Sequence, residues 1–314
     1  MPNTRLLIVP LAAALAATLA ACGGNGGSNG NGSGLSGSIR IDGSSTVAPL
    51  SEAAADEFQQ KNSGVRVTVG TSGTGGGFEK FCRGEIDIAD ASRQIEDDEK
   101  ALCRKNGVEW AEVQVANDGI AVVVSKDNDF VKCLTVAELR KIWDQGSRVK
   151  NWNQVRSSFP NRPIELYGPG TDSGTFDFFT KAINGEEGRS RTDYNASEDD
   201  NVLVQGVAGN AGALGYFGLS YYEQNQDKLK LVEVDGGQGC VAPTKETVQN
   251  GTYKPLSRPL FIYPSREALQ RREVREFVRF YIDNEEQLTK RALFIDLTDA
   301  QQRKARQEVE KLAG

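Results

Sequence analysis

Short apolar runs alternate with segments of helical spacing along most of this chain. Residues 39–41 and 65–69 alternate apolar and polar side chains with a period of two, which predicts β-strands. Between them, the apolar residues of 47–58 recur every three or four positions, which predicts a helix with one buried face. A strand, a helix and a second strand in this order are typical of a parallel α/β sheet.

The same alternation of predicted strands and helices continues to the C-terminus. Further strands are predicted over residues 86–89, 120–124, 164–167, 212–217 and 229–234. Further helices are predicted over residues 78–83, 135–144, 175–183, 274–282 and from 298 to the C-terminus. Thr135 with Glu138, and Thr298 with Gln301, have the spacing of a capping box and mark two helix starts. We find no internal sequence repeat.

Composition narrows the classes of function. A length of 314 residues is enough for two domains with separate cores. The chain has no histidine, which argues against a Ser-His-Asp or Cys-His mechanism and against a typical zinc site. The net charge of −6 argues against nucleic-acid binding. We therefore expect neither enzyme activity nor a cofactor, a metal site or a nucleic-acid partner.

The N-terminus predicts export. Residues 1–22 have the pattern of a signal peptide, with Arg5 before an apolar stretch that is too short to span a bilayer comfortably. Its end, Leu19-Ala20-Ala21-Cys22, resembles a bacterial lipobox, in which Cys22 carries the lipid. A plain secretory signal with a chance cysteine is the alternative. Residues 23–37 are rich in Gly, Asn and Ser and predict a flexible tether. We expect an extracytoplasmic protein that is lipid-anchored to the cell membrane.

Four cysteines follow the tether, and an even number in an exported chain predicts two disulfides. Three pairings are possible. We predict Cys82–Cys103, which closes a short local loop, and Cys133–Cys240. Free buried thiols are the alternative, whereas a metal site is disfavoured because no two of these cysteines are closely spaced.

Three loops rich in Gly, Ser and Thr each lie between a predicted strand and a predicted helix. They span residues 43–46, 71–77 and 170–175. Helix N-termini leave unpaired N–H groups, glycines allow close approach of the backbone, and hydroxyls add hydrogen-bond donors. Three such ends pointing at one spot would hold a dehydrated tetrahedral oxyanion. Each loop alone fits a helix cap with a turn, and a Walker A loop fits poorly because no lysine follows Gly77 or Gly174 in the required place.

These loops and their neighbours resemble the phosphate-binding proteins of bacterial phosphate ABC importers, the PstS family. The matching segments are Asp42–Leu50, Gly70–Phe78, Asp87–Arg93, Gly168–Phe176, Gly212–Phe217 and Pro255–Leu260. The resemblance covers residues 38–310 in order. It implies an α/β type II periplasmic-binding-protein fold, with two lobes, hinge strands between them and a ligand cleft between the lobes.

The resemblance also implies where the chain crosses between lobes and what the protein does. Lobe one would comprise residues 38–117 plus 240–314, and lobe two residues 118–239, with crossings near 116–119 and 236–241. The implied function is capture of inorganic phosphate and its delivery to the separate permease subunits of an ABC importer. We expect a monomer that reaches the membrane through its lipid.

Ligands carry over from the resemblance residue by residue. The first loop would supply Ser45, Thr46 and Val47; the second Thr74, with Ser72 as an alternate; the third Ser173, Gly174 and Thr175. These groups are hydroxyls and backbone N–H donors.

Two positions depart from the best-known pattern of the family. Ser92 stands where an aspartate accepts the proton of phosphate, and Pro169 stands where an arginine contacts phosphate. Arg93 is a candidate for the missing cation, with a surface salt bridge as the alternative. Asp172 is a candidate for the missing acceptor, with a helix cap as the alternative. The preference for phosphate over sulfate therefore rests on the overall resemblance.

Other functions remain as alternatives at this point. The same fold could bind sulfate, molybdate or a phosphonate, or could act as a phosphate sensor. The tripeptide Asp172-Ser173-Gly174 matches an aspartic protease, but no second Asp-Ser/Thr-Gly exists, and two carboxyls are needed. The aromatic residues at 216–217 and 221–222 would form a patch for a protein partner if exposed, although we expect core packing.

Overall fold

The structure is a computed structural model, and it describes residues 34–171 and 173–313. The signal segment, most of the tether, Cys22 and Asp172 lie outside these residues. Within the described ranges, no helix combines the length and the apolar character needed to cross a membrane.

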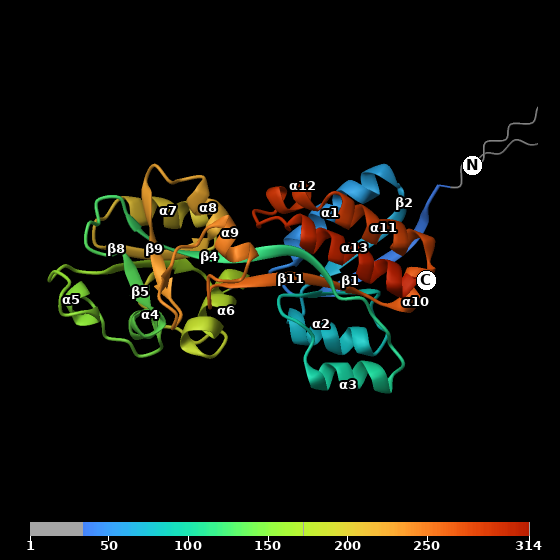
Figure 1. Cartoon of the computed structure of the whole chain (residues 1–314), viewed down its shortest axis with the longest axis horizontal. Helices are drawn as coiled ribbons and strands as arrows, with labels where there is room; N and C mark the ends of the chain where they lie inside the picture. Colours follow the sequence, from blue (N-terminus) through green and yellow to red (C-terminus); the bar gives the residue numbers. More distant parts are fainter. Residues whose placement is uncertain (1–33, 172, 314) are drawn as a thin grey trace, which may run out of the picture. The chain divides into compact units, whose positions relative to one another are not determined.

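Strands and helices alternate through most of the described chain (Figure 1). The strands are β1 (Ser36–Gly43), β2 (Gly64–Gly70), β3 (Ile88–Ala91), β4 (Val113–Ser125), β5 (Cys133–Thr135), β6 (Glu165–Pro169), β7 (Asn195–Ser197), β8 (Ala213–Gly218), β9 (Leu229–Asp235), β10 (Cys240–Val241) and β11 (Ser257–Pro264). The helices are α1 (Ala48–Lys61), α2 (Gly73–Cys82), α3 (Asp97–Lys105), α4 (Val136–Trp143), α5 (Trp152–Val155), α6 (Gly174–Phe179), the π-helix η1 (Thr180–Asn184), α7 (Asp200–Ala208), α8 (Leu219–Glu223), α9 (Lys245–Gln249), α10 (Arg266–Gln270), α11 (Arg272–Asp283), α12 (Glu285–Arg291) and α13 (Asp299–Ala313).

Lobe one is built on the strand order β2-β1-β3-β11-β4. β1 pairs in parallel with β2 and β3, because α1 and α2 carry the chain back to the start of the next strand. β11 pairs antiparallel with both β3 and β4. The carboxyl ends of β1 and β3 therefore lie side by side, and the first Gly/Ser/Thr loop follows β1 directly.

Lobe two shares strand β4 with lobe one. Residues 113–119 of β4 pair with β11, while residues 120–125 pair with β8 on one side and β9 on the other. β6 and β7 extend the sheet beyond β8, and β5 and β10 pair with β9. β4 and β11 are thus the strands that pass from one lobe to the other (Figure 1).

Three apolar cores hold these elements. In lobe one, a core under α1, α11 and α13 includes Leu50, Phe58 and Phe277, and a second core under α2 and α3 includes Phe78. In lobe two, one core surrounds Trp143. Both faces of β3 and of residues 260–264 of β11 are covered, so these segments are buried without interruption, whereas β1 and β2 alternate buried and exposed residues.

The return crossing differs from the prediction near 236–241. β10 pairs with β9, and Val248, Tyr253 and Leu256 belong to the lobe-two core. The Tyr253 hydroxyl donates to the backbone oxygen of Ile120 at 2.9 Å. Residues 240–256, which the resemblance placed in lobe one, pack instead with lobe two, and the chain returns through β11. The sequence obscured this because the stretch has little apolar periodicity of its own.

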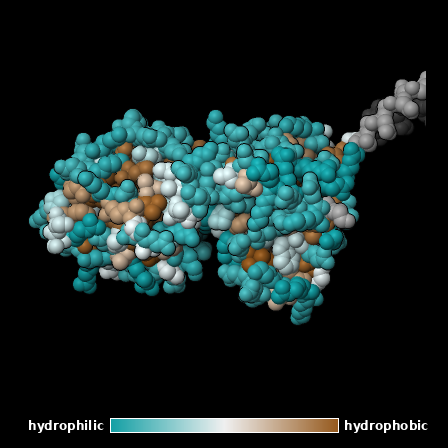
Figure 2. All heavy atoms as spheres, in the orientation of Figure 1, coloured by the Kyte–Doolittle hydropathy of each residue, from teal (hydrophilic) through white to brown (hydrophobic). Residues whose placement is uncertain are grey.

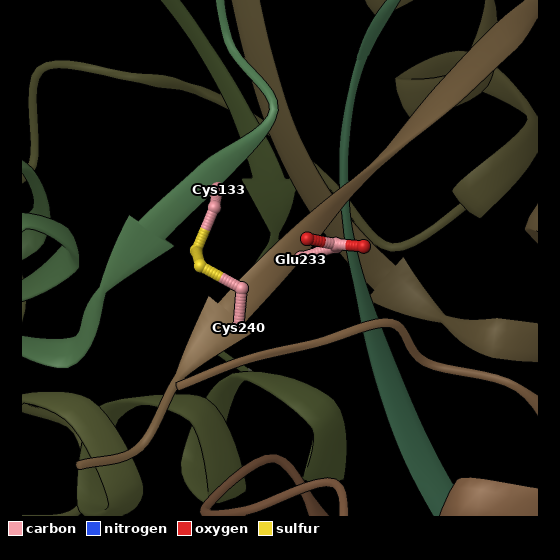
Figure 3. A group of neighbouring side chains, drawn as sticks. All are labelled: Cys133, Glu233 and Cys240. Atoms are coloured by element: carbon pink, nitrogen blue, oxygen red, sulfur yellow. A yellow bond between two sulfur atoms is a disulfide. The ribbon is translucent and has the colours of Figure 1, made fainter. Parts of the chain in front are cut away.

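Both predicted disulfides are present in the structure. Cys82–Cys103 joins α2 to α3, and Cys133–Cys240 joins β5 to β10. Figure 3 shows Glu233 of β9 close to the second pair, and the three residues have the proximity of metal ligands. Metal ions bind thiolates, and both sulfurs here are in the disulfide. This group is therefore a covalent cross-link between β5 and β10 rather than a metal site.

Two predicted boundaries moved for physical reasons. β4 begins at Val113, whereas the prediction began at 120. The polar residues Asn117 and Asp118 interrupt the apolar pattern in the sequence, but both are buried where the strand crosses between the lobes. α2 begins at Gly73 rather than at Phe78, so most of the second Gly-rich segment is the first turns of a helix. The capping box of Thr135 is confirmed, with Glu138 N–H donating to its hydroxyl at 3.1 Å.

The aromatic residues near β8 form core contacts. Tyr216 and Phe217 are fully buried, and Tyr216 stacks on Phe179 with ring centroids 3.7 Å apart. The idea of an exposed aromatic patch at 216–217 is therefore wrong. Figure 2 shows mostly hydrophilic residues on the visible face, with hydrophobic residues in small groups. Val202, which is 55% exposed, is the large apolar side chain that stands out among the described residues.

Candidate anion-binding site

A cavity of about 640 Å³ brings together residues from both lobes. Its wall consists of Ser44, Ser45, Thr46, Ser72, Gly73, Thr74, Gly75, Gly76, Ser92, Arg93, Glu96, Gly174, Asp177, Phe178, Lys181, Glu187 and Arg258. The wall thus contains most of the predicted ligand residues. Of the described ones, Val47, Ser173 and Thr175 are not part of it.

Glycines let the first two loops approach each other closely. Gly43 has φ +144°, and a Cβ there would stand 2.1 Å from the backbone oxygen of Asp90. A Cβ on Gly77 would stand 2.5 Å from Cα of Gly43. Only glycine fits at these contacts, so the start of α2 packs directly on the first loop.

One backbone N–H of the first loop makes a hydrogen bond within the loop. Val47 N–H donates to the backbone oxygen of Ser44 at 3.2 Å, and the Val47 side chain is fully buried. The structure therefore uses this N–H inside the loop. Ser45 and Thr46, in contrast, present their side chains to the cavity.

The second loop is held by Asp42, which also pairs with Lys80. Asp42 accepts hydrogen bonds from the N–H and the hydroxyl of Ser72 at 2.9 and 2.8 Å, and Lys80 Nζ lies 2.5 Å from its other oxygen. Burial acts to raise the pKa of Asp42, but the hydrogen bonds from Lys80 and Ser72 outweigh it and lower this pKa. The Ser72 hydroxyl is thus engaged in positioning the loop.

Thr74 and Ser92 form a hydroxyl pair on the cavity wall. Their oxygens are 3.1 Å apart, and Ser92 N–H donates to the Thr74 oxygen at 3.2 Å. The pair offers at least one further O–H donor to a bound anion. The Ser92 position, where the resemblance expects a carboxylate, therefore carries a neutral donor.

The third loop meets the first across the cleft. The Ser173 hydroxyl accepts from Thr175 N–H at 3.2 Å and caps α6. A Cβ on Gly174 would stand only 2.3 Å from the Thr46 hydroxyl oxygen. The glycine thus permits direct contact between the start of α6 in lobe two and the first loop in lobe one.

Arg93 is occupied by neighbouring carboxylates. Its guanidinium makes two hydrogen bonds of 2.8 Å to Glu99 and lies 3.4 Å from Glu96. The hydrogen bonds to Glu99 raise its pKa further, and burial acts against them. This geometry supports the salt-bridge alternative for Arg93, although the side chain still borders the cavity.

Arg258 is the central cation of the cavity, and it was not among the predicted ligands. Nε donates to Asp118 Oδ2 at 3.1 Å, while Nη2 donates to the Thr46 hydroxyl at 2.9 Å and to the Gly174 carbonyl at 3.2 Å. The guanidinium carbon lies 3.9 Å from the ring centroid of Phe178. One side chain on a crossing strand therefore contacts lobe one, lobe two and the second crossing strand.

The burial of Arg258 makes this contact a strong one. Its side chain is 13% exposed and that of Asp118 is 8% exposed. Burial lowers the pKa of Arg258, and the Asp118 carboxylate opposes that change. A guanidinium stays protonated in proteins, so a fixed positive charge borders the cavity. The signal for Arg258 was present, since residues 255–260 matched the family, but its 212-residue separation from Thr46 hid the contact.

Comparison with known proteins places this geometry in a family. Residues 29–285 match the family described as the PBP superfamily domain. Protein SphX of Synechococcus elongatus is 52% identical over 262 residues, which is 82% of this chain and 77% of SphX. The phosphate-binding protein PstS of Staphylococcus saprophyticus is 41% identical over 263 residues, which is 83% of this chain and 81% of PstS. The chain belongs to the PstS/SphX family.

Solved structures agree with this PstS/SphX assignment. The structure of a possible phosphate binding protein from Planctomyces limnophilus has a TM-score of 0.86 and 47% identity, and it covers 89% of this chain and 100% of that chain. PstS from Borrelia burgdorferi, at 21% identity and a TM-score of 0.63, supports the fold alone. The predicted type II periplasmic-binding-protein fold is confirmed, and the family is one of solute-binding proteins rather than enzymes.

Asp177 gives this PstS/SphX cavity a carboxyl group that the sequence analysis missed. It lies on α6, one turn after Ser173, and is half-buried, whereas Glu96 and Glu187 on the same wall are exposed. Burial raises the pKa of Asp177 to about 6, Glu187 adds to the increase, and Arg258 opposes it. Asp177 follows the third loop by two residues, but a single acidic residue inside a helix gave no sequence signal.

Proposed function

We propose that this protein is an extracytoplasmic solute-binding lipoprotein that captures inorganic phosphate between its lobes and delivers it to the permease of an ABC importer. The observation that carries the proposal is the contact of Arg258 with Thr46 and Gly174 at the cavity between the lobes. The name of the Staphylococcus saprophyticus relative, a phosphate-binding protein, supports the choice of ligand.

The cavity supplies what a dehydrated phosphate dianion needs. Arg258 provides a fixed charge with several N–H donors in a planar fork, which suits phosphate oxygens. Ser45, Thr46, Ser92 and Gly174 lie on the same wall, and their hydroxyls and the N–H of Gly174 would serve as neutral donors. Closure of the lobes around the anion would exclude water and strengthen each of these hydrogen bonds by lowering the local dielectric.

Capture follows from donors on two lobes. A ligand that is held by Thr46 from lobe one and by Gly174 from lobe two binds the closed arrangement more tightly than an open one, so binding shifts the population toward closure. Arg258 sits on β11 and its partner Asp118 on β4, the two strands that join the lobes. Closure of the two lobes is thereby linked to Arg258, the cation that holds the ligand in this proposal.

The membrane part of the proposal rests on the N-terminal sequence. A lipid on Cys22 and the tether over residues 23–37 would keep a monomeric binding protein beside its permease. The partners in this proposal are inorganic phosphate, the permease subunits and the membrane, with no nucleic acid, cofactor or metal. Mass spectrometry of the mature protein tests the lipid on Cys22.

A different oxyanion is the second candidate, because Ser92 offers a hydroxyl where the family pattern has a proton acceptor. The deciding experiment is calorimetric titration of the protein, stripped of ligand by unfolding and refolding, with phosphate and then sulfate. We expect tight one-to-one binding of phosphate and no heat from sulfate. No response to phosphate, or equal binding of both anions, would move the function to another oxyanion or to a sensor.

Replacing Asp177 with asparagine is expected to weaken the preference for phosphate over sulfate by about tenfold. In this proposal the Asp177 carboxylate accepts the P–OH proton, which sulfate lacks at neutral pH. Because its pKa is about 6, the wild type should gain a donor and admit sulfate more easily as the pH falls below 6. Sulfate competition against phosphate, measured from pH 5 to 8, checks both effects.

Glu187→Gln is the matched control for Asp177→Asn, because Glu187 lies on the same wall but is exposed. It should leave the anion preference within twofold of wild type. An unchanged sulfate-to-phosphate ratio in Asp177→Asn would remove Asp177 from this role, and Asp172 would then be the next residue to replace.

A further inference from the structure

Asp90 lies directly beneath the first anion-binding loop. It is the third residue of β3, is fully buried, and stands opposite Gly43 in the pairing of β1 with β3. Its backbone oxygen accepts the N–H of Ser44 at 2.9 Å. Two residues later Ser92 borders the cavity, as Ser44 does. The backbone of Asp90 is thus bonded to the first loop, and the residues on either side of it in space, Ser44 and Ser92, line the cavity.

The Asp90 carboxyl points away from the cavity into a polar cluster. Oδ1 accepts the hydroxyl of Ser51 at 2.9 Å, and that hydroxyl is 3.1 Å from the hydroxyl of Tyr281. All three side chains are buried. Oδ2 has no hydrogen-bond partner among the described residues. A charged carboxylate at this place would therefore keep only one hydrogen bond in a water-free interior.

The charges around Asp90 also oppose its ionisation. Asp42 of β1 and Glu52 of α1 both disfavour a negative charge there, and Tyr281 is the titratable group that faces it from α11. Burial, with these two acids, raises the pKa of Asp90 to about 8, and the hydrogen bond from Ser51 limits the increase. Burial, the unpartnered Oδ2 and the two neighbouring acids thus all favour the protonated form of Asp90.

We propose that Asp90 is a positioning residue whose proton keeps the floor of the first loop uncharged, so that oxyanion binding weakens when this proton is lost. The inference rests on the proposed function, since it concerns the same cavity. A new negative charge beneath Ser44 repels a bound dianion through low-dielectric protein and strains the packing of the loop on the cluster. By linkage, the bound anion in turn holds the proton on Asp90 more tightly.

The composition of the chain isolates this effect in a narrow pH window. There is no histidine, and the four cysteines of the described residues are in disulfides. The other buried carboxyls with strongly raised pKa values titrate lower, with Asp177 at about 6 and Asp200 and Glu285 at about 7. Between pH 7.5 and 9.5, Asp90 is therefore the carboxyl next to the first loop whose charge is expected to change, and Lys230, whose pKa burial lowers, lies on β9 and does not line the cavity.

The test is the dissociation constant for inorganic phosphate from pH 7 to 9.5, in the wild type and in Asp90→Asn. We expect the wild type to lose affinity by about threefold to tenfold across this range. Asp90→Asn should keep at pH 9.5 the affinity that it has at pH 7, within twofold, because asparagine does not ionise. Carbon-detected NMR of the Asp90 carboxyl should show a midpoint near 8 that rises when phosphate is added.

Ser51→Ala is the second variant and does not depend on Asp90→Asn folding. It removes the hydrogen bond that favours the charged form, so the break in the affinity profile and the NMR midpoint should both move to higher pH. A flat wild-type profile, or an equal loss in Asp90→Asn, would overturn the proposal. A wild type that binds no phosphate would instead overturn the proposed function, and an Asp90 midpoint near 4 would separately refute its neutral proton.

Discussion

Arg258→Gln should weaken phosphate binding by about a hundredfold, because it removes the fixed charge and the charge-assisted hydrogen bonds of the guanidinium, each of which contributes about 1.5–3 kcal/mol. The glutamine cannot replace the donors to Thr46 and Gly174, and it leaves the Asp118 carboxylate buried without its cation. Calorimetric titration with phosphate at neutral pH measures the loss.

Two controls separate binding from folding. Arg93→Gln removes a cation on the same wall that is already paired with Glu99, so it should cost less than about fivefold. Arg258→Gln with Asp118→Asn removes both charges, and it should recover thermal stability but not phosphate affinity. If Arg258→Gln binds within threefold of wild type, Arg258 is a structural residue and the charge that holds the ligand lies elsewhere.

Gly174→Ala is expected to reduce phosphate affinity by about tenfold to a hundredfold while leaving the fold intact. The added methyl would stand 2.3 Å from the Thr46 hydroxyl, so the first loop and the start of α6 cannot approach as they do here. The clash exists only when the lobes are closed on each other, so the free energy of unfolding of each lobe should change little. Phosphate titration and small-angle scattering with and without phosphate measure both properties.

The double variant Gly174→Ala with Thr46→Ala makes the prediction specific. Removing the Thr46 hydroxyl removes the nearest atom of the clash, so the loss in the double variant should be smaller than the sum of the two single losses. Gly209→Ala, at the end of α7, is the matched control, because a Cβ there meets nothing closer than 3.4 Å. Additive losses would mean that Gly174 acts without Thr46.

Sequence patterns were sufficient where a feature is local. The strand and helix periods, the Thr135 cap and the Gly/Ser/Thr loops each occupy a few consecutive residues, and the structure shows each of them. The resemblance to the PstS family placed Thr46, Thr74 and Ser92 at one site, and all three lie on the wall of one cavity.

The features that the sequence did not predict depend on contacts between distant segments. Arg258 and Asp118 pair because β4 and β11 are neighbours, and although residues 255–260 match the family, no local pattern predicts this contact. Ser72 was a candidate ligand, but its hydroxyl is bound to Asp42 thirty residues away. The burial that makes Asp90 and Asp177 unusual is likewise a property of the packed fold and not of their neighbours in sequence.

The position of β11 has a consequence for how the chain is made. Lobe two is one continuous stretch from 120 to 256, apart from the contribution of Ile295 to its core. The lobe-one sheet, by contrast, needs β11 between β3 and β4. During synthesis, which runs from the N-terminus to the C-terminus, the chain can therefore complete lobe two while the central strand of the lobe-one sheet is still missing. The first strands to emerge, β1 and β2, belong to the lobe that is finished last, and the anion cavity can form only after β11 has been inserted.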